Sequence, residues 1–408
     1  MLNDTQLKSC VRYIIDEATY VIENFSPRSP GSAGEYKTQQ HIKETLARYS
    51  DSAPVIESFQ VAPHAFLGGQ QVIPSLLVLL ATMVYWWSPL ASTFLSGLAV
   101  TIVYQELFRY KRFLDPIFPK RTSHNVYATR KPKGEIKRRI ILNGHADATH
   151  EWFIHYHAPR LFKILIPLSL LGLLLKCATD IIVLLLGGGL SGDLGTLWQV
   201  CGMIQLVIAP TALVGLLMTS PRVVPGANDN LSGTFSAVGL FKTLHDAGVN
   251  LENTELGVLI TGSEEAGLRG AKAWCEKHAQ DYNDVETIFV VMDTMGEPEH
   301  LKVYNRDLNA TVPLDKEVCA LLQNAMQQCG YDHPYGSIFL GASDGAAFTQ
   351  GGMRVATMAA MDPAPAHYYH TRLDHWSIMC PEALEATLRV LITALETYDH
   401  KGLSNTEK

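Results

Sequence analysis

Four apolar segments, arranged in two pairs, constrain the fold of this chain more than any other feature. The segments cover residues 72–88, 92–108, 164–186 and 196–218. A membrane core of about 30 Å needs an apolar helix of roughly 17–25 residues, and each segment falls in that range. The tryptophans at segment ends match the position of interfacial aromatic side chains; they are Trp86, Trp87 and Trp198. The pattern predicts two transmembrane helical hairpins, over 65–112 and 161–220. The alternative is a buried helical cap on a soluble domain.

The third segment contains two charged residues, Lys176 and Asp180. Residues four apart lie on one face of a helix and can form an ion pair. A charge at bilayer depth is costly and usually faces the interior of a helix bundle. The segment is therefore either a span with an internal ion pair or a kinked, partly interfacial helix.

Basic residues gather on one side of both hairpins. Because a hairpin returns the chain to the side from which it left, all flanking segments share that side. The flanks carry Arg109, Lys111, Arg112, Lys120, Arg121, Arg160, Lys163 and Arg222, whereas the far loops carry only Asp193. The positive-inside rule then predicts an integral membrane protein whose remaining domain faces the cytoplasm.

Composition excludes several classes of protein. The net charge of −7 provides no basic surface, so nucleic acid is not an expected partner. The seven cysteines are scattered and form no C-x-x-C pair, which favours a reducing compartment over a disulfide framework. The polar first ten residues predict no cleavable signal peptide. The oligomeric state stays open.

Without the hairpins, the chain alternates strand-like and helix-like segments. Strands are predicted at 55–61, 124–129, 138–143, 255–260 and 287–292, and helices at 4–23, 35–48, 232–246, 268–279, 314–329 and 381–398. This order predicts an α/β domain with a mixed, mostly parallel sheet covered by helices on both faces. We assign it to residues 1–61, 122–157 and 222–400, followed by a flexible tail at 401–408.

Metal-ligating side chains follow nearly every predicted strand of this domain. The strand-end loops supply His145 with Asp147, Asp229, the pair Glu264 and Glu265, Asp293, and His370 with Asp374. Reactive groups of such sheets meet beyond the strand ends. Two histidines and several carboxylates suit zinc with nitrogen and oxygen ligands. Because no cysteine lies in these loops, a closed structural zinc site is not expected.

The ordered blocks "NGHADA", "GANDNLSG", "GSEEAGLRG", "VMDTMG" and "YHTRLD" resemble the di-zinc aminopeptidases of metallopeptidase clan MH. This superfamily also contains glutaminyl cyclases and transferrin-receptor-like proteins. The stretch "RSPGSAGEYKTQQHIKETL" is similar to the family's N-terminal region. The resemblance covers the α/β segments and not the apolar hairpins, and it implies a zinc-exopeptidase-like fold.

The resemblance also implies a role for each matched residue. His145 and Asp293 would bind one zinc, Glu265 and His370 a second, and Asp229 both. Asp147 would orient its neighbours by hydrogen bonding. Glu264 would be the general base on a zinc-bridging water and would pass its proton to the leaving amine.

The chain departs from the family pattern in two places. Where family members often have S-D-H, this sequence has Ser343-Asp344-Gly345, which affects substrate placement rather than the metal ligands. The second hairpin leaves from the loop after His145 and Asp147, so the mouth of the site is expected near the membrane surface. The histidines on that path are read as membrane-proximal polar residues rather than extra ligands; they are His150, His155 and His157.

The leading hypothesis is a membrane-anchored zinc metallopeptidase with two zinc ions per chain. It would release N-terminal residues from short peptides, with a peptide or amide substrate and the lipid bilayer as partners. A close variant would hydrolyse lipid-like N-acyl amides that enter from the bilayer. The alternatives from other classes are glutaminyl cyclase-like acyl transfer with one zinc and a non-catalytic receptor.

Overall fold

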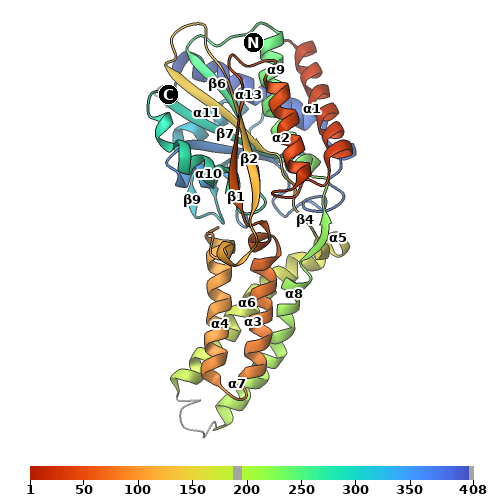
Figure 1. The fold of residues 1–408 in the computed structure, drawn as a ribbon, viewed down its shortest axis with the longest axis vertical. Helices are drawn as coiled ribbons and strands as arrows, with labels where there is room; N and C mark the ends of the chain where they lie inside the picture. Colours follow the sequence, from red (N-terminus) through yellow and green to blue (C-terminus); the bar gives the residue numbers. More distant parts are fainter. Residues whose placement is uncertain (187–194, 404–408) are drawn as a thin grey trace. The chain divides into compact units, whose positions relative to one another are not determined.

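The computed structural model describes residues 1–186 and 195–403 (Figure 1). The chain divides into two compact units. The sheet unit comprises Met1–Pro63, Lys120–Thr149 and Val223–Lys408, and the helical unit comprises His64–Pro119 and His150–Arg222. Each unit is described by itself.

A nine-stranded mixed sheet forms the centre of the sheet unit in the described part of the chain. Its order is β1 (Val55–Val61), β2 (Arg121–Arg130), β6 (Thr254–Thr261), β3 (Arg138–His145), β7 (Glu286–Met295), β11 (Arg354–Ala360), β8 (Leu301–Asp307) and β10 (Gly336–Ser337), with β9 (Val312–Pro313) paired to β8. The central strands β6, β3, β7 and β11 are parallel, whereas β1 and β2 pair antiparallel with their neighbours. β8 is antiparallel to β11 and β9 and parallel to β10. The predicted mixed α/β sheet is confirmed.

Helices cover both faces of this sheet (Figure 1). They are α1 (Asp4–Phe25), α2 (Ala33–Leu46), α9 (Gly233–Asp246), α10 (Arg269–His278), α11 (Lys316–Gln328), α12 (Asp344–Gln350) and α13 (Pro381–Lys401). α9 packs on β3 and β7, and α10 packs with α12. Every residue of β6 is buried, which explains why residues 256–260 of this strand (LGVLI) form a continuous apolar run rather than an alternating pattern.

α1 shows how local signals produce one of these helices. Asn3 accepts the backbone N–H of Gln6, and the Gln6 side chain accepts the backbone N–H of Asn3, so a capping box fixes the start. Leu7, Ile14 and Ala18 lie on the buried face at helical spacing. The helix therefore packs that face against α9 and α13.

Sequence patterning missed two long strands, β8 and β11. β8 mixes Lys302, Asn305 and Arg306 with apolar residues, and β11 contains three alanines between its larger side chains. Both strands are nevertheless mostly buried. β11 pairs with β7, and β8 pairs with β11. A local sequence pattern cannot predict such pairing between distant segments.

The parallel register brings the predicted functional loops to one edge of the sheet. His145 at the end of β3 pairs with Thr261 at the end of β6. Asn143 pairs with Val291 of β7, two residues before Asp293. The loops after these three strands therefore begin at the same level.

Both apolar insertions begin and end at adjacent points of the sheet unit. The first lies between Val61 and Arg121, which are paired across β1 and β2. The second lies between Thr149 and Val224, and the Val224 N–H donates to the Thr149 carbonyl at 3.0 Å. Each insertion thus leaves and re-enters the sheet unit through neighbouring residues.

The described part of the helical unit contains four helices that are long and apolar enough to cross a membrane. These stretches are Ala65–Val84, Pro89–Phe108, Pro159–Leu185 and Gly195–Leu216. They comprise η1 (Ala65–Gly69) with α3 (Gln70–Val84), α4 (Pro89–Val103) with η2 (Tyr104–Phe108), α6 (Pro159–Leu185), and α7 (Gly195–Ile208) with η4 (Ala209–Ala212) and α8 (Leu213–Leu216). The connections contain η3 (Asp115–Ile117), α5 (Phe153–His157) and a two-stranded ribbon of β4 (His150–Trp152) and β5 (Thr219–Val223).

The predicted third segment forms one continuous helix, α6, with Pro167 inside it. Lys176 and Asp180 form the predicted ion pair at 2.5 Å, and both side chains are buried. Ser96 donates to the Asp180 carboxylate at 2.6 Å and Gln205 donates at 2.8 Å. Helices α4 and α7 therefore both contribute partners to the charged pair on α6, as expected for a charge that faces a bundle interior.

Two predictions fall partly outside the described residues. The far loop of the second hairpin, with Asp193, lies in the undescribed range 187–194. Of the predicted tail, Lys401 ends α13, Leu403 is buried, and residues 404–408 lie outside the description.

Candidate metal centre

His145 is the last residue of β3, and its position is fixed from two sides. Its backbone carbonyl accepts a hydrogen bond from Thr234 Oγ1 of α9 at 2.7 Å. A Cβ on Gly144 would lie 2.6 Å from the backbone nitrogen of Thr234, so only glycine allows this approach. The helix start thus packs directly against the end of β3, with the His145 ring buried beside Asp147.

Asp229 lies between the two predicted histidine ligands. Its Oδ1 is 3.3 Å from Nε2 of His145, and its Oδ2 is 3.0 Å from Nε2 of His370. The residue belongs to η5 (Ala227–Ser232), a short irregular turn before α9. Asp374 orients this turn, because its carboxylate accepts the N–H groups of Asn228 at 2.8 Å and of Asp229 at 3.0 Å.

The adjacent carboxylates Glu264 and Glu265 point to different partners. Oε2 of Glu264 is 3.8 Å from Nε2 of His145, whereas Oε1 of Glu265 is 3.5 Å from Nε2 of His370. The two oxygens of Asp147 accept the backbone N–H groups of Glu264 and Glu265, each at 3.0 Å. Asp147 therefore fixes the backbone from which the two side chains diverge.

The predicted residues form two groups whose donor atoms could each hold a metal ion. The first group is His145, Glu264 and Asp293, and the second is Asp229, Glu265 and His370; within each, the ligand atoms lie within 4.8 Å of one another. His145 and His370 both face Asp229, which therefore connects the two groups. The structure thus brings together all the residues for which the resemblance implies the role of ligand or base.

The electrostatics of this site reflect many carboxylates buried together. Burial and the Asp229 charge raise the pKa of Asp293 to about 7. Burial also raises the pKa of Glu264 well above its usual range, as do the charges of Asp344 and Glu265, although His145 opposes this. Burial would raise the pKa of Asp229 too, but hydrogen bonds from both histidines lower it well below its usual value.

The donor set fits zinc. Oε1 of Glu265 is buried and accepts no hydrogen bond from any described residue. Nitrogen and carboxylate oxygen donors suit zinc, and divalent cations would compensate the buried negative charges. Like-charged side chains packed this closely are otherwise costly to bury.

Asp374 and Asp344 have roles that the sequence did not indicate. Asp374 was counted among the possible ligands, but both of its oxygens accept backbone N–H groups and it belongs to neither metal group. Asp344 is buried near the site and accepts a hydrogen bond from Thr261 Oγ1 at 2.5 Å. Burial raises the pKa of Asp344 to about 6. The positions of Asp374 and Asp344 in the sequence do not predict these hydrogen bonds.

The histidines of the second insertion contribute to neither group. His150, His155 and His157 all belong to the helical unit, and no candidate metal group of the described residues includes them. That they are not extra ligands stays a prediction.

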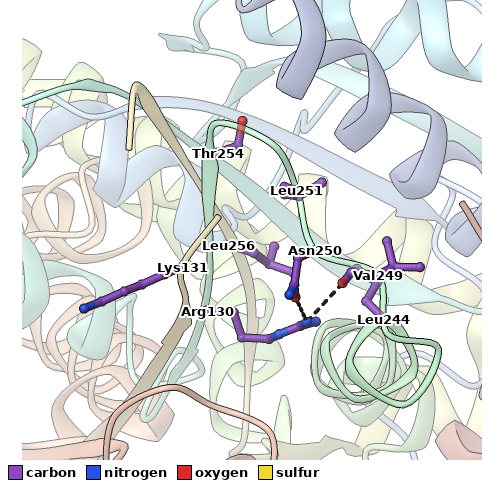
Figure 2. Close-up of a pocket in the computed structure, with 8 residues that line it drawn as sticks. All are labelled: Arg130, Lys131, Leu244, Val249, Asn250, Leu251, Thr254 and Leu256. Carbon is purple, nitrogen blue, oxygen red and sulfur yellow. Dashed lines mark hydrogen bonds between the residues drawn. The ribbon is translucent and has the colours of Figure 1, made fainter. Parts of the chain in front are cut away.

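A small pocket in the sheet unit is unrelated to this site. It has about 200 Å³ of empty space beside Arg130, Asn250 and Thr254 (Figure 2). Thr254 begins β6, whereas Glu264 follows the end of that strand. The Arg130 guanidinium already donates to the Val249 carbonyl at 3.0 Å and to Asn250, as Figure 2 shows.

Comparison with known proteins agrees with this geometry. Residues 214–395 match the family model described as Peptidase family M28. No curated protein matches the chain in sequence.

Solved structures with the same fold include peptidases and cyclases. An aminopeptidase from Aneurinibacillus sp. strain AM-1 has a TM-score of 0.58 at 15% identity, covering 97% of this chain and 96% of that one. A zinc aminopeptidase from Bacillus subtilis has a TM-score of 0.53 at 13% identity, covering 95% and 94%. The glutaminyl cyclase of Porphyromonas gingivalis has a TM-score of 0.54 at 12% identity, covering 96% and 97%.

At these identities the solved structures establish the fold, and the family match covers the segment that contains Asp229, Glu264, Glu265, Asp293 and His370. Together they confirm the resemblance to clan MH that the ordered motifs indicated. The chain therefore shares the fold of these zinc aminopeptidases and cyclases, and its residues 214–395 match Peptidase family M28.

Proposed function

We propose that the chain is a membrane-anchored hydrolase of amide bonds that removes N-terminal residues from short peptides. The observation that carries this proposal is the position of Asp229 between His145 and His370, with Glu264 beside the first group. In this proposal His145 and Asp293 would hold one zinc, Glu265 and His370 would hold the other, and Asp229 would be a ligand of both. Zinc bound there would act as a Lewis acid on the scissile carbonyl and acidify the attacking water.

The side chains of this chain would then perform the proton transfers. Glu264 accepts a proton from the attacking water at its carboxylate and later donates it to the leaving amine. Asp147 holds the backbone of Glu264 and Glu265 in place, so the base keeps its direction. The buried surroundings exclude bulk water and raise the proton affinity of Glu264, which suits a group that must bind and release a proton.

Activity, zinc content and a base variant test this proposal together. The full chain, purified in detergent, is assayed with chromogenic aminoacyl amides beside Glu264→Gln. The expected wild-type protein cleaves these amides and holds about two zinc ions per chain. The expected variant keeps its zinc and loses turnover by about 100-fold or more. A zinc-loaded wild type that cleaves no aminoacyl amide contradicts the peptidase assignment.

Glutaminyl cyclase-like acyl transfer is the second candidate, since solved cyclases share the fold at a similar TM-score. Two separate donor groups favour the hydrolase. A measured content of about one zinc per chain, with cyclisation of N-terminal glutamine, would favour the cyclase.

The four long apolar helices support membrane anchoring, and the basic flanking residues support a cytoplasmic sheet unit. A protease site placed before Asp4 tests the orientation in sealed vesicles. Cleavage only in inside-out vesicles agrees with the proposal, and cleavage only in right-side-out vesicles contradicts it.

A lipid-like N-acyl amide is the substrate variant that the apolar helices suggest. In liposomes, lipid amides should then turn over faster than peptide amides of equal concentration. Equal or slower turnover contradicts the variant and leaves the peptidase proposal intact.

A further inference from the structure

The stretch from the loop after α1 into the first turn of α2 carries two buried charged residues that the proposed chemistry does not use. Arg28 and Glu35 both have 0% exposure, and neither belongs to a metal group. They lie in the "RSPGSAGE" stretch, which precedes the first ligand by more than a hundred residues. Burying a charged side chain costs free energy unless the charge is paired or hydrogen-bonded. The contacts of Arg28 and Glu35 therefore indicate what these residues do.

Arg28 joins two of the loops that carry predicted ligands. Its Nε donates to the Ala146 carbonyl at 3.0 Å, directly after His145 in the chain. Its Nη1 and Nη2 donate to the carbonyls of Pro225 at 2.7 Å and Gly226 at 3.0 Å, in the turn that leads to Asp229. The planar guanidinium thus holds both loops at a fixed separation, which the single ammonium of a lysine cannot do.

The Arg28 backbone adds a further link to the same loop. The N–H of Ala148 donates to the Arg28 carbonyl at 3.0 Å. Burial lowers the pKa of Arg28 to about 10, while the charges of Asp147, Asp374, Asp229 and Glu35 oppose this. Arg28 is therefore still a cation at neutral pH, beside the carboxylates of the site.

Glu35 acts on the loop that carries the proposed base. Its Oε1 accepts the N–H of Ser263 at 2.7 Å and lies 3.2 Å from the Ser263 hydroxyl. Its other oxygen accepts the N–H of Gly31 at 2.8 Å and the hydroxyl of Ser123 at 3.0 Å. Ser263 has a φ of 53°, a left-handed conformation that disfavours any residue with a Cβ, and it directly precedes Glu264.

We propose that Arg28 and Glu35 are positioning residues of the metal centre with separable effects. Arg28 sets the spacing between the His145 and Asp229 loops and thereby the affinity for zinc. Glu35 holds Ser263 in its left-handed conformation and thereby directs Glu264, with little effect on zinc affinity. This inference rests on the proposed function, in which the two groups bind zinc and Glu264 is the base.

Arg28→Lys tests the first part against a matched control, Arg130→Lys. Arg130 is also a buried arginine that donates to backbone carbonyls, those of Phe241 and Val249, but it lies at the far end of β6 from the site. The readout is the zinc affinity of the metal-free full chain in detergent, measured by competition with a chelator. Arg28→Lys should weaken zinc binding by about 10–100-fold, whereas Arg130→Lys should leave it within about 3-fold of wild type. Equal zinc affinity of Arg28→Lys and wild type overturns this part.

Glu35→Gln tests the second part against Asp399→Asn. Asp399 is a buried carboxylate that accepts the N–H groups of Glu252 at 2.7 Å and Asn253 at 2.9 Å, before the start of β6. Glu35→Gln should lower kcat by about 10-fold with KM and zinc affinity near the wild-type values. It should also speed hydrogen exchange of the Ser263 amide, which Asp399→Asn should not. Unchanged Ser263 exchange, or a loss of zinc affinity as large as that of Arg28→Lys, overturns this part.

Zinc binding by the wild-type chain distinguishes a failure of the proposed function from a failure of this inference. A wild-type chain that binds no zinc overturns the proposed function and this inference with it. A wild type that binds zinc, with both variants matching their controls, overturns the inference alone.

Discussion

Asp147 and Asp374 make the same contact at two places in the metal centre. Each uses both carboxylate oxygens to accept the N–H groups of two consecutive residues, Glu264 with Glu265 in one case and Asn228 with Asp229 in the other. Each contact therefore fixes the backbone direction of a loop at the point where a predicted ligand leaves it. The resemblance implies such a role for Asp147 but assigns no role to Asp374.

Removing one acceptor from Asp374 should weaken the metal centre without removing a ligand. In Asp374→Asn an amide NH₂ replaces one of the two oxygens and faces a backbone N–H. We expect zinc affinity to fall by about 10–100-fold. Chelator competition measures this change. Asp399→Asn, which makes the same replacement before the start of β6, should lose stability but keep its zinc affinity; equal zinc losses in both variants would contradict the prediction.

The two donor groups should lose metal independently. Asp293→Asn removes a carboxylate from the group with His145 and leaves the group with Glu265 and His370 complete. We expect about one zinc per chain in place of about two, measured by elemental analysis after dialysis. Asp284→Asn is the control, because Asp284 is a surface partner of Arg139. Retention of the full zinc content by Asp293→Asn would refute the assignment of that ligand.

The metal-free protein should become less stable as pH rises through the weakly acidic range. Burial raises the pKa of Asp293 and of Asp374 to about 7, and the pKa of Asp344 to about 6. Each of these carboxyl groups has a higher pKa in the folded protein than in the unfolded chain. At a pH between those two pKa values, the folded protein binds more protons than the unfolded chain, so the free energy of unfolding falls as pH rises. The Tm of chelator-treated protein should therefore fall between about pH 5 and about pH 7.

Zinc-loaded protein provides the comparison for this pH experiment. Bound cations would keep the carboxylates ionised, so its Tm should stay level or rise over the same range. If the Tm of the metal-free protein instead rises from about pH 5 to about pH 7, the buried carboxyl groups do not control the pH dependence of its stability.

Gly345 explains one departure from the family pattern. A Cβ at this position would lie 2.3 Å from Thr357 Oγ1 and 3.1 Å from Asp307 Oδ2, so no side chain fits. We expect Gly345→Ala to lower the free energy of unfolding by about 1–3 kcal/mol, and Gly345→His, which restores the histidine of the family, to lower it further. Denaturant titration measures both. Gly97→Ala is the control, since among the described residues no atom outside its own helix backbone and its chain neighbours lies within 4 Å of a Cβ on that helical glycine. Equal effects at both positions would contradict the steric argument.

The ion pair on α6 should stabilise the helical unit only as a pair. Lys176→Met leaves the buried Asp180 without a cation, which costs about 3–5 kcal/mol in comparable cases. The double variant Lys176→Met with Asp180→Leu removes both charges and should recover part of that loss. Tm in detergent measures both proteins. A double variant less stable than the single one would indicate that the network of Ser96 and Gln205 matters more than charge balance.

The sequence predicted those parts of the molecule that depend on local patterns. The strand at 55–61 has the predicted bounds, because alternation and flanking polar residues are local. The predicted site residues converge because each follows a strand of the same sheet, and parallel strand ends meet at one edge.

Contacts between distant positions could not be predicted in this way. Arg28 donates to the carbonyl of a residue 118 positions away, and Glu35 accepts from one 228 positions away. Neither residue differs in type from the surface residues around it in the sequence, so only the folded structure shows that they are buried. The strand β11 was missed for a related reason, because its alanines become buried only through pairing with β7 and β8.

The adjacent ends of the two insertions have a practical consequence. Val61 faces Arg121 across β1 and β2, and Thr149 is hydrogen-bonded to Val224, so each insertion could be excised and its ends rejoined by a short turn. The remaining chain would keep every strand of the main sheet and every residue of both donor groups. We therefore expect that a chain without the two insertions can still form the sheet unit, because its folding needs neither apolar hairpin to connect the strands.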